Sequence, residues 1–333
     1  MTAASSDALN IHIYTDPDFR QSKDFADERV LGILAEFEGL SPRIALSFSH
    51  DEAALNQALE DAEVLILVGA LDIADVATRA PRLRWIHITS AGVDRVPLDR
   101  LPDHVLVTNA KGSHEVRTRE FSMTALLMLN NRLPDFVTQQ REKHWEQTAI
   151  EPIDGKTVVI LGMGALGSAA AEAAKRLDLK VVGVSRSGKP HPLADVSLPQ
   201  SRLKEALTEA DFLLITLPLT AETRNVVGEA ELAAMPARGG VINIGRGPVL
   251  DVAALAERLE AGQLRGAVLD VFPEEPLAAD SPYWTTRNLI VTPHSGLYDA
   301  DYVPRCLRFF FANVARYLDG EPLENRVDTN LGY

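Results

Sequence analysis

The sequence predicts an α/β protein with two parallel sheets, each covered by helices on both faces. Short apolar runs rich in Val, Ile and Leu alternate with helix-like stretches along most of the 333-residue chain, a rhythm typical of βαβ units. A chain of this length exceeds the usual size of one hydrophobic core, so we expect two domains. At residues 158–176 a glycine-rich turn joins an apolar run to an Ala-rich helical stretch, as where a strand enters a helix in such a sheet.

Composition indicates a folded globular protein and excludes several functional classes. The hydrophobic fraction is 46% and the charged fraction 24%, values typical of a packed domain rather than a disordered chain. The 33 basic against 47 acidic residues leave a net charge of −14 without any Lys/Arg run, which opposes binding to nucleic acid or to an anionic membrane. The one cysteine, Cys306, excludes an intramolecular disulfide, and the 8 histidines lack metal-ligand spacing, so no metal site is expected.

Targeting signals are not evident in the sequence. Met1 to Leu9 has neither a basic nor an apolar region of a secretory signal, and no apolar run approaches the roughly 20 residues that span a bilayer. We therefore expect a cytoplasmic protein.

The first third of the chain contains the pattern of a complete small sheet. The expected strands are Ile11–Tyr14, Ile44–Phe48, Val64–Val68, Trp85–Thr89 and Val105–Thr108. The expected helices between them are Asp24–Phe37, Glu52–Leu59 and Asp72–Arg79. In parallel sheets of this kind, binding sites lie at the carboxyl ends of the strands.

A second series follows a long helix expected from about Glu115 to Leu133, which is unusually apolar around Phe121–Leu129. The expected strands of this series are Thr157–Leu161, Lys180–Val184, Phe212–Thr216, Val241–Asn243, Ala267–Leu269 and Leu289–Val291. A final helix is expected at about Asp301–Leu318. Because no Gly/Ser linker separates the two series, we expect rigid helices to connect the domains and the last helix to return to the first domain.

The most specific local motif is G-x-G-x-x-G, which here is Gly162, Met163, Gly164, Ala165, Leu166 and Gly167. Gly162 allows a tight turn, Gly164 lets a pyrophosphate approach the backbone, and Gly167 permits close packing of helix on strand. The helix that follows, Ser168–Arg176, would present free N–H groups and a positive dipole end to the phosphates. Glycines often only make turns, but a strand before and a helix after this motif favour a dinucleotide site.

The end of the next strand indicates which dinucleotide is bound. NAD-binding domains usually place Asp or Glu there to bind the ribose 2′-hydroxyl, whereas this strand ends in Ser185-Arg186-Ser187. Arg186 could pair with a 2′-phosphate, and both serines could donate hydroxyl hydrogen bonds. The alternative is an ordinary solvated turn. The missing acid favours NADP(H), with NAD(H) as the other possibility.

Three widely spaced polar residues are candidates for catalysis. Arg246, Glu275 and His294 each follow a different expected strand, so all three would lie at the same edge of one parallel sheet. Each also has an ordinary structural interpretation: a capping arginine, an exposed acid in a Pro-rich loop, and a packed loop histidine.

Together these segments resemble the D-isomer-specific 2-hydroxyacid dehydrogenases, and the resemblance covers nearly the whole chain. Leu217–Arg224, Ala234–Pro236 and Asn243–Gly247 also resemble signatures of that family. The resemblance implies a Rossmann NAD(P)-binding domain at about 113–296, inserted into a flavodoxin-like substrate-binding domain made of 1–112 and 297–333.

The resemblance also implies roles for the candidate residues. His294 would protonate the keto oxygen during reduction, Glu275 would orient the ring and favour its imidazolium form, and Arg246 would hold the substrate's carboxylate. Asp270 resembles the residue that contacts the nicotinamide carboxamide. The implied cofactor contacts beyond the glycine motif and the Ser185–Ser187 turn are Leu217, Pro218, Thr223, Ile244, Gly245, Arg246, Asp270, His294 and Gly296.

A loop in the first domain, Ser90-Ala91-Gly92-Val93-Asp94, resembles the segment whose backbone N–H groups receive the substrate carboxylate. The expected substrate contacts are therefore Ala91, Gly92, Val93, Arg246 and His294. An ordinary turn explains the loop equally well on sequence alone.

Within the family, several branches are distinguishable. Glu275 stands where the formate-oxidising relatives have Gln, and the sequence ends at Tyr333 without the regulatory domain of the long phosphoglycerate dehydrogenases. The Ser185–Ser187 turn resembles the NADP-using glyoxylate and hydroxypyruvate reductases. His144-Trp145 resembles a segment that reaches a neighbouring subunit, although Trp145 could equally be a packing anchor. The resemblance implies a homodimer.

The sequence therefore favours NADP-dependent reduction of a small 2-oxo acid of the glyoxylate or hydroxypyruvate type to the D-2-hydroxy acid. One alternative is an NAD-dependent D-lactate-like dehydrogenase. The other, of a different class, is a dinucleotide-sensing binding protein like the family's corepressor relatives, which the lack of disordered tails disfavours.

Overall fold

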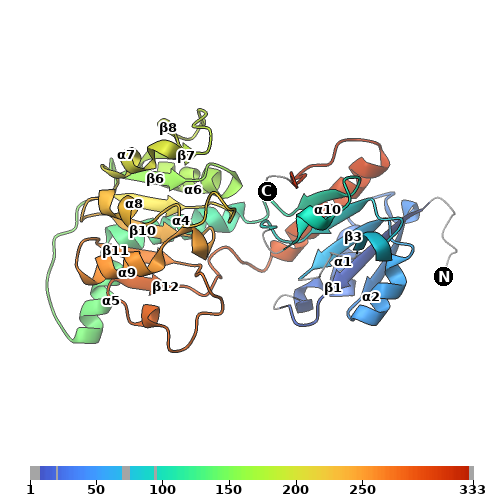
Figure 1. The fold of residues 1–333 in the computed structure, drawn as a ribbon, viewed down its shortest axis with the longest axis horizontal. Helices are drawn as coiled ribbons and strands as arrows, with labels where there is room; N and C mark the ends of the chain where they lie inside the picture. The colour runs from blue at the N-terminus through green and yellow to red at the C-terminus, as the bar shows by residue number, and fades with distance from the viewer. Residues whose placement is uncertain (1–7, 20–21, 70–75, 94–95, 330–333) are drawn as a thin grey trace. The chain divides into compact units, whose positions relative to one another are not determined.

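The chain forms two compact units, as the computed structural model in Figure 1 shows. Residues 8–19, 22–69, 76–93 and 96–329 are described by the structure. Unit 1 comprises Met1–Ser113 and Asp299–Tyr333, and unit 2 comprises His114–Tyr298. Unit 2 is thus inserted into unit 1 in sequence.

Within its described residues, unit 1 is built on a sheet of five strands that are all parallel. They are β1 (Leu9–Thr15), β2 (Ile44–Ser49), β3 (Val64–Val68), β4 (Trp85–Ile88) and β5 (Leu106–Asn109), in the order β2-β1-β3-β4-β5. This is the strand order of flavodoxin. β3 is buried at every position, which explains its unbroken apolar sequence.

Helices cover this sheet, and their ends follow the local sequence. α2 begins after Asp51, whose carboxylate accepts a hydrogen bond from the backbone N–H of Ala54 at 2.8 Å, a good N-cap. The helix expected at Asp24–Phe37 is divided into a short 3-10 turn and α1, and 72–75 of the expected helix Asp72–Arg79 lie outside the described residues. The elements are η1 (Ser22–Phe25), α1 (Asp27–Leu34), η2 (Ser41–Arg43), α2 (Glu52–Leu59), α3 (Val76–Arg79), η3 (Leu98–Arg100) and α10 (Tyr302–Leu318).

Unit 2 contains a wider parallel sheet, in which the described part of the chain supplies seven strands. They are β6 (Thr157–Leu161), β7 (Lys180–Ser185), β8 (Val196–Pro199), β9 (Phe212–Ile215), β10 (Gly240–Asn243), β11 (Gly266–Leu269) and β12 (Leu289–Val291). The order is β12-β11-β10-β9-β6-β7-β8, the Rossmann order with one further strand. β6 therefore has its sequential neighbour β7 on one side and β9 on the other, and this switch point is where ligands bind in such sheets.

The helices of unit 2 differ from expectation mainly at one break. The long apolar helix ends at Asn130, because Arg132 adopts a left-handed backbone (φ +57°), and a new helix begins at Leu133. The helices are α4 (Glu115–Asn130), α5 (Leu133–Glu142), α6 (Ala165–Arg176), η4 (Gln200–Arg202), α7 (Leu203–Leu207), α8 (Glu229–Ala234), η5 (Gly247–Val249), α9 (Val252–Glu260) and η6 (Pro282–Trp284).

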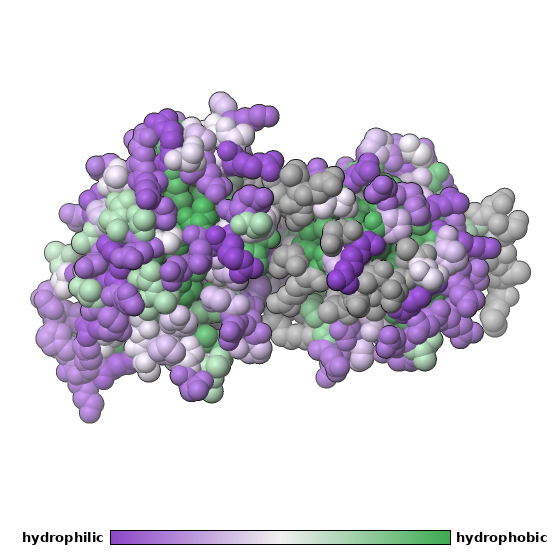
Figure 2. All heavy atoms as spheres, viewed as in Figure 1, coloured by the Kyte–Doolittle hydropathy of each residue, from purple (hydrophilic) through white to green (hydrophobic). Residues whose placement is uncertain are grey.

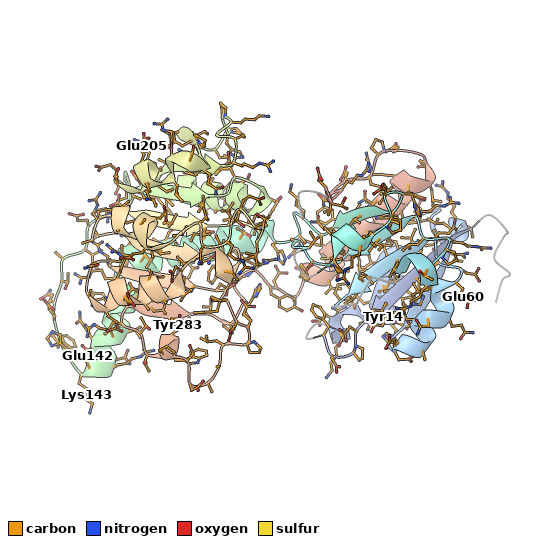
Figure 3. The ribbon with its side chains drawn as sticks, viewed as in Figure 1. Tyr14, Glu60, Glu142, Lys143, Glu205 and Tyr283 are labelled. Carbon is orange, nitrogen blue, oxygen red and sulfur yellow. The ribbon has the colours of Figure 1, made fainter. Side chains whose placement is uncertain are left out.

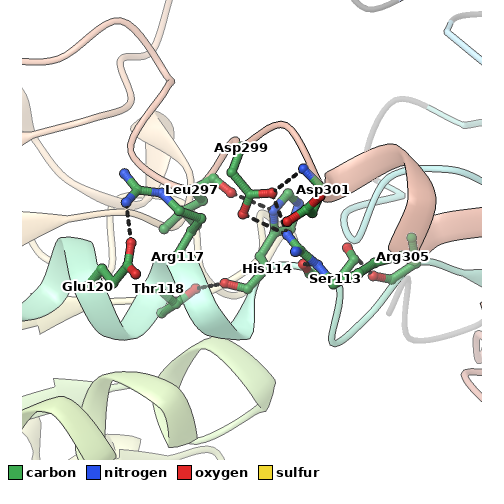
Figure 4. A network of polar contacts seen from close by, with 10 residues as sticks. Ser113, His114, Arg117, Thr118, Glu120, Leu297, Asp299, Asp301 and Arg305 are labelled. Atoms are coloured by element: carbon green, nitrogen blue, oxygen red, sulfur yellow. Dashed lines mark hydrogen bonds and ion pairs between the residues drawn. The ribbon is translucent and has the colours of Figure 1, made fainter. Parts of the chain in front are cut away.

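The two points where the chain passes from one unit to the other are each fixed by polar contacts (Figure 4). In unit 1, Arg305 donates from Nε to the Ser113 carbonyl oxygen at 2.8 Å and forms a double contact with the Asp299 carboxylate at 2.7 and 2.8 Å. In unit 2, the His114 ring nitrogen Nδ1 lies 3.0 Å from the Leu297 carbonyl oxygen. Within each unit, the incoming and outgoing segments are thereby held together.

Polar side chains cover most of the visible face of each unit in Figure 2. Among the described residues, no helix is long and apolar enough to cross a membrane. Among the large hydrophobic side chains of the described residues, Trp145 is the most exposed, at 95%. It follows α5, whose end is marked by Glu142 and Lys143 in Figure 3. Such exposure rules out the packing-anchor interpretation of Trp145 within this chain.

Candidate active site

The glycine motif after β6 forms a tight turn with space in front of it. Gly162 has φ +103°, a conformation that favours glycine. A Cβ at Gly167 would lie 1.8 Å from the Gly162 carbonyl oxygen, so only glycine lets α6 approach the turn this closely. A Cβ at Gly164, in contrast, would meet no atom within 4 Å. The backbone at Gly164 is therefore open to a ligand.

The N-terminus of α6 is suited to an anion. Its N-cap is Gly164, which has no side chain to bond the first N–H groups, and the first turn carries no acidic residue. The Thr216 hydroxyl donates to the Gly162 carbonyl oxygen at 2.7 Å and fixes the turn from β9. Open backbone N–H groups at the positive end of a helix are the usual seat of a pyrophosphate. The residues present thus fit a bound dinucleotide.

The turn after β7 is ordered by its own serines. The Ser185 hydroxyl accepts a hydrogen bond from the Gly188 N–H at 3.1 Å, and the Ser187 hydroxyl accepts one from the Lys189 N–H at 3.4 Å. Arg186 is exposed. Lys189 adds a second cation to this turn, which sequence reasoning did not single out.

One acidic side chain also lies near this turn. The pKa of Glu222 is lowered, mainly by a hydrogen bond from Thr220 and to a smaller extent by the positive charge of Arg186. Glu222 belongs to the loop after β9, so its position was not apparent from the strand that carries Arg186.

The loop after β9 contains the expected contacts Leu217, Pro218 and Thr223. The Thr223 hydroxyl donates to the Pro218 carbonyl oxygen at 2.7 Å, which folds the loop back on itself. A Cβ at Gly245 would lie 2.6 Å from the Leu217 carbonyl oxygen. Glycine at 245 therefore lets the loops that follow β9 and β10 meet backbone to backbone.

Arg246 is presented by a loop that a buried asparagine organises. Asn243, which is fully buried, accepts a hydrogen bond from the Gly245 N–H at 3.0 Å and donates to the Arg246 carbonyl oxygen at 3.1 Å. The half-buried Arg246 side chain donates to the Gly245 carbonyl oxygen at 2.9 Å. A Cβ at Gly247 would lie 2.0 Å from the carbonyl carbon of Phe272. The Arg246 loop thus packs directly on the start of the loop that carries Glu275.

Glu275 and His294 form a direct pair. The Nδ1 atom of His294 lies 2.7 Å from Oε2 of Glu275, and the other carboxylate oxygen accepts a hydrogen bond from the Phe272 N–H at 3.0 Å. The Glu275 side chain is 23% exposed and the His294 side chain 44% exposed. A carboxylate that holds one ring nitrogen fixes the orientation of the imidazole and leaves the other nitrogen available for proton transfer.

Asp270 fixes the loop that carries His294. It is 1% exposed, and one of its oxygens accepts hydrogen bonds from the Thr292 hydroxyl at 2.6 Å and from the N–H groups of Ser295 and Gly296 at 3.1 and 3.0 Å. Burial raises the pKa of Asp270, while these hydrogen bonds act in the opposite direction. His294 itself has a left-handed backbone (φ +48°), and its N–H donates to the Asp270 carbonyl oxygen. Asp270 therefore has an anchoring role that sequence reasoning did not foresee.

The candidate loop of unit 1 follows β4, and its Asp94 lies outside the described residues. The carbonyl oxygens of Ser90, Ala91 and Gly92 accept hydrogen bonds from the Ala110 N–H, the Asn109 side chain and the Ser90 hydroxyl. Among the described residues, no protein acceptor faces the N–H groups of Ala91, Gly92 and Val93. Within the described residues, the carbonyl oxygens of this loop are therefore hydrogen-bonded, while its backbone N–H groups can donate to a ligand.

The candidate residues of unit 2 come together from the carboxyl ends of neighbouring strands, namely β6, β7, β9, β10, β11 and β12. Parallel strands place all these ends at one edge of the sheet. Asn243, Gly247, Lys189 and Glu222 were not among the predicted site residues.

Residues 123–296 match the family model described as D-isomer specific 2-hydroxyacid dehydrogenase, NAD binding domain. Over 304 residues the chain is 34% identical to glyoxylate/hydroxypyruvate reductase B of Yersinia pestis. The match covers 89% of this chain and 90% of that protein.

Solved structures show the same likeness. A D-isomer specific 2-hydroxyacid dehydrogenase from Xanthobacter autotrophicus, in complex with NADPH and MES, superposes with a TM-score of 0.82 at 27% identity, covering 98% of this chain and 100% of that one. An NADPH-dependent glyoxylate/hydroxypyruvate reductase from Sinorhizobium meliloti, in complex with NADP and sulfate, gives a TM-score of 0.80 at 28% identity, with 98% and 100% covered.

Proposed function

The chain belongs to the D-isomer-specific 2-hydroxyacid dehydrogenase family, and on that premise we propose that it reduces a glyoxylate- or hydroxypyruvate-like 2-oxo acid to the D-2-hydroxy acid with NADPH. The observation that carries this proposal is the His294–Glu275 pair beside the Arg246 loop, at the edge of the sheet that also presents the open glycine turn.

His294 is the general acid of this proposal. With Nδ1 held by Glu275, its Nε2–H would donate a proton to the keto oxygen as the substrate carbon is reduced, and the same nitrogen would accept that proton in the reverse direction. Glu275 would fix the orientation of the imidazole towards the substrate. Asp270 would keep the ring in place through the 292–296 loop.

Arg246 is the residue that would hold the substrate. A guanidinium can bind a carboxylate and a neighbouring carbonyl oxygen with two parallel N–H groups, which orients the 2-oxo acid and stabilises charge that develops on its oxygen. The rigid support from Asn243 and the packing of Gly247 on Phe272 would hold that orientation.

The cofactor supplies a hydride when it is bound. Gly162 to Gly167 and the N-terminus of α6 would hold its pyrophosphate. The family resemblance implies further contacts to the rest of the dinucleotide, from Leu217, Pro218, Thr223, the Ile244–Arg246 segment, Asp270, His294 and Gly296.

We assign the Ser185–Ser187 turn to a 2′-phosphate, and hence prefer NADP(H) to NAD(H). No carboxylate ends β7, and Arg186 and Lys189 supply positive charge. The NADPH and NADP complexes of the two similar solved structures support the same assignment. Glu222 opposes it, because its charge lies near Arg186.

We further assign dinucleotide binding to unit 2 and substrate binding to unit 1. The N–H groups of Ala91, Gly92 and Val93, which meet no acceptor among the described residues, are suited to a carboxylate. As the family resemblance implies, we also propose a homodimer, in which a second copy would cover the 95% exposed Trp145.

Initial rates test the proposal. NADPH and NADH oxidation are measured side by side with glyoxylate, hydroxypyruvate, pyruvate and a bulky aromatic 2-oxo acid. We expect NADPH-linked reduction of glyoxylate or hydroxypyruvate. Faster NADH oxidation with pyruvate would instead indicate a D-lactate-like dehydrogenase. Binding of the cofactor without turnover of any acid would indicate a sensor.

A further inference from the structure

The connection between β7 and β8 is unusual for parallel strands. Residues 186–195 join Lys180–Ser185 to Val196–Pro199, and none of these ten residues is helical. A parallel crossover normally needs a dozen or more residues and usually carries a helix. We call residues 186–195 the strap. Because it lacks helical hydrogen bonds, other contacts must hold it in place.

The strap is tied to both ends of helix α6. Near its middle, Nε2 of His191 lies 3.1 Å from the hydroxyl oxygen of Ser168, in the first turn of α6. At its end, the Asp195 carboxylate accepts hydrogen bonds from Lys175, in the last turn of α6, and from the Val181 N–H at 2.7 Å. The strap therefore runs along α6 from its N-terminal to its C-terminal end.

Small side chains make room for the strap. Leu193 and Ala194 pack against the core cluster that contains the α6 residues Ala170, Ala171 and Ala174. A Cβ at Gly183 in β7 would lie 3.1 Å from the Ala194 side chain. The Ala-rich α6 packs mainly against α4, β6 and β7, and Leu193 and Ala194 of the strap join the same cluster.

His191 has a defined protonation pattern. The Leu193 N–H donates to Nδ1 of His191 at 3.3 Å, so Nδ1 is the acceptor and the ring proton of a neutral imidazole lies on Nε2. The Nε2–H therefore donates to Ser168. The His191 backbone N–H also donates to the Ser197 hydroxyl at 3.1 Å, which joins the same residue to β8.

The position of this tie is the reason to assign it a role. Ser168 follows directly on Gly167, at the end of α6 proposed to bind the pyrophosphate. The strap begins with Arg186 and Ser187, in the turn proposed to bind the 2′-phosphate, and Gly188 is wedged against Pro199, where a Cβ would lie 2.5 Å from the proline nitrogen. The His191–Ser168 hydrogen bond thus fixes the Ser185–Ser187 turn relative to the N-terminus of α6.

We propose that His191 is a positioning residue for cofactor selectivity, which holds the Ser185–Ser187 turn at the distance from the α6 N-terminus that a 2′-phosphorylated dinucleotide requires. This rests on the proposed binding of the 2′-phosphate by that turn. His191 acts through Ser168 and the strap. NAD(H), which has no 2′-phosphate, does not depend on the tie.

Calorimetric binding of NADP⁺ and NAD⁺ to the ligand-free protein tests the proposal. His191→Phe keeps a ring but loses the hydrogen bond, and Ser168→Ala removes the partner. For each variant we expect the Kd of NADP⁺ to rise about fivefold, the factor that one net hydrogen bond supplies, while the Kd of NAD⁺ stays within about twofold. The double variant should bind like either single variant, because both remove the same interaction.

Two further variants separate selectivity from general structure. Lys175→Met loosens only the far end of the strap, so both Kd values should stay near those of the wild type. His191→Gln places an N–H close to the Nε2 position and should restore NADP⁺ binding, which keeps the test valid if His191→Phe does not fold.

Equal weakening of both dinucleotides, or no change in either, overturns the role of His191. A wild-type protein that binds NADP⁺ no more tightly than NAD⁺ overturns the assignment of the 2′-phosphate and this proposal with it. The two failures are distinguishable, because the second is seen before any substitution is made.

Discussion

Units 1 and 2 are both parallel sheets covered by helices, yet they place their polar side chains differently. In unit 2, Arg246, Glu275 and His294 lie beyond the carboxyl ends of strands, where they are partly exposed. In unit 1, His12 lies within β1 and His87 within β4, with exposures of 1% and 0%. The candidate catalytic histidine therefore lies beyond the end of a strand, whereas the two histidines that pack in the core lie within strands.

The environments of the buried histidines explain the difference. His12 is held between the Ser47 and Ser49 hydroxyls at 2.8 and 2.7 Å, and Nδ1 of His87 lies 2.8 Å from the Thr108 hydroxyl. Burial lowers the pKa of His12 to about 4 and that of His87 to about 3. Both are neutral near pH 7, so they contribute to packing and not to proton transfer there.

Of the substitutions that probe this comparison between the units, replacing Arg246 in unit 2 should have the largest effect on catalysis. Arg246→Lys keeps the charge but loses the planar pair of donors, so we expect kcat/KM for the 2-oxo acid to fall about a hundredfold. Steady-state kinetics measures the loss, and the free energy of unfolding should remain that of the wild type. Unchanged kinetics would remove Arg246 from substrate binding.

Acidification should act on unit 1 through its buried histidines. Their folded-state pKa values are depressed, so the unfolded chain binds more protons, and stability is lost as the pH falls from 6.5 towards 4 for His12 and 3 for His87. At pH 5 the loss is about 2 kcal/mol for each histidine. Urea unfolding at pH 7 and pH 5 measures it.

A variant that lacks one of the two buried histidines sharpens this test. His87→Phe removes the titrating ring, which packs on Phe310. The larger ring and the lost contact with Thr108 should cost about 1–3 kcal/mol, equally at both pH values. We expect its stability to fall less between pH 7 and pH 5 than that of the wild type. An identical fall in both proteins would show that His87 stays protonated or exposed in the fold.

Ser185→Asp should give the smallest effect, on selectivity alone. An acid at the end of β7 would accept hydrogen bonds from a ribose and repel a 2′-phosphate, so the NADPH/NADH ratio of kcat/KM should fall about tenfold. If the ratio stays constant, the turn does not contact the 2′ position.

The sequence was most informative where one physical requirement dominates. Buried parallel strands such as β3 must be continuously apolar, and the expected bounds of Val64–Val68, Thr157–Leu161 and Leu289–Val291 agree with the structure. β8 was missed, because it is a short edge strand that ends in Pro199 and is only partly buried. The break at Arg132 was also missed, since a left-handed arginine has no local sequence signal.

The candidate site shows the same division. The order of strands and loops was enough to bring Arg246, Glu275 and His294 to one edge, because parallel strands leave no other arrangement. The supports contributed by Asn243 and Gly247, and the anchoring by Asp270, depend on contacts between loops far apart in sequence. No local pattern predicts such contacts, and the same holds for the tie between His191 and Ser168.

The central claim is that His294, held by Glu275, transfers the proton. Its most direct test is turnover of His294→Ala beside the wild type, with the preferred cofactor and acid, and with dinucleotide binding measured by calorimetry on the same preparations. We predict a loss in kcat of at least about a hundredfold while the cofactor Kd stays within about twofold. Turnover within about threefold of the wild type would contradict the claim, because a general acid contributes at least about a hundredfold.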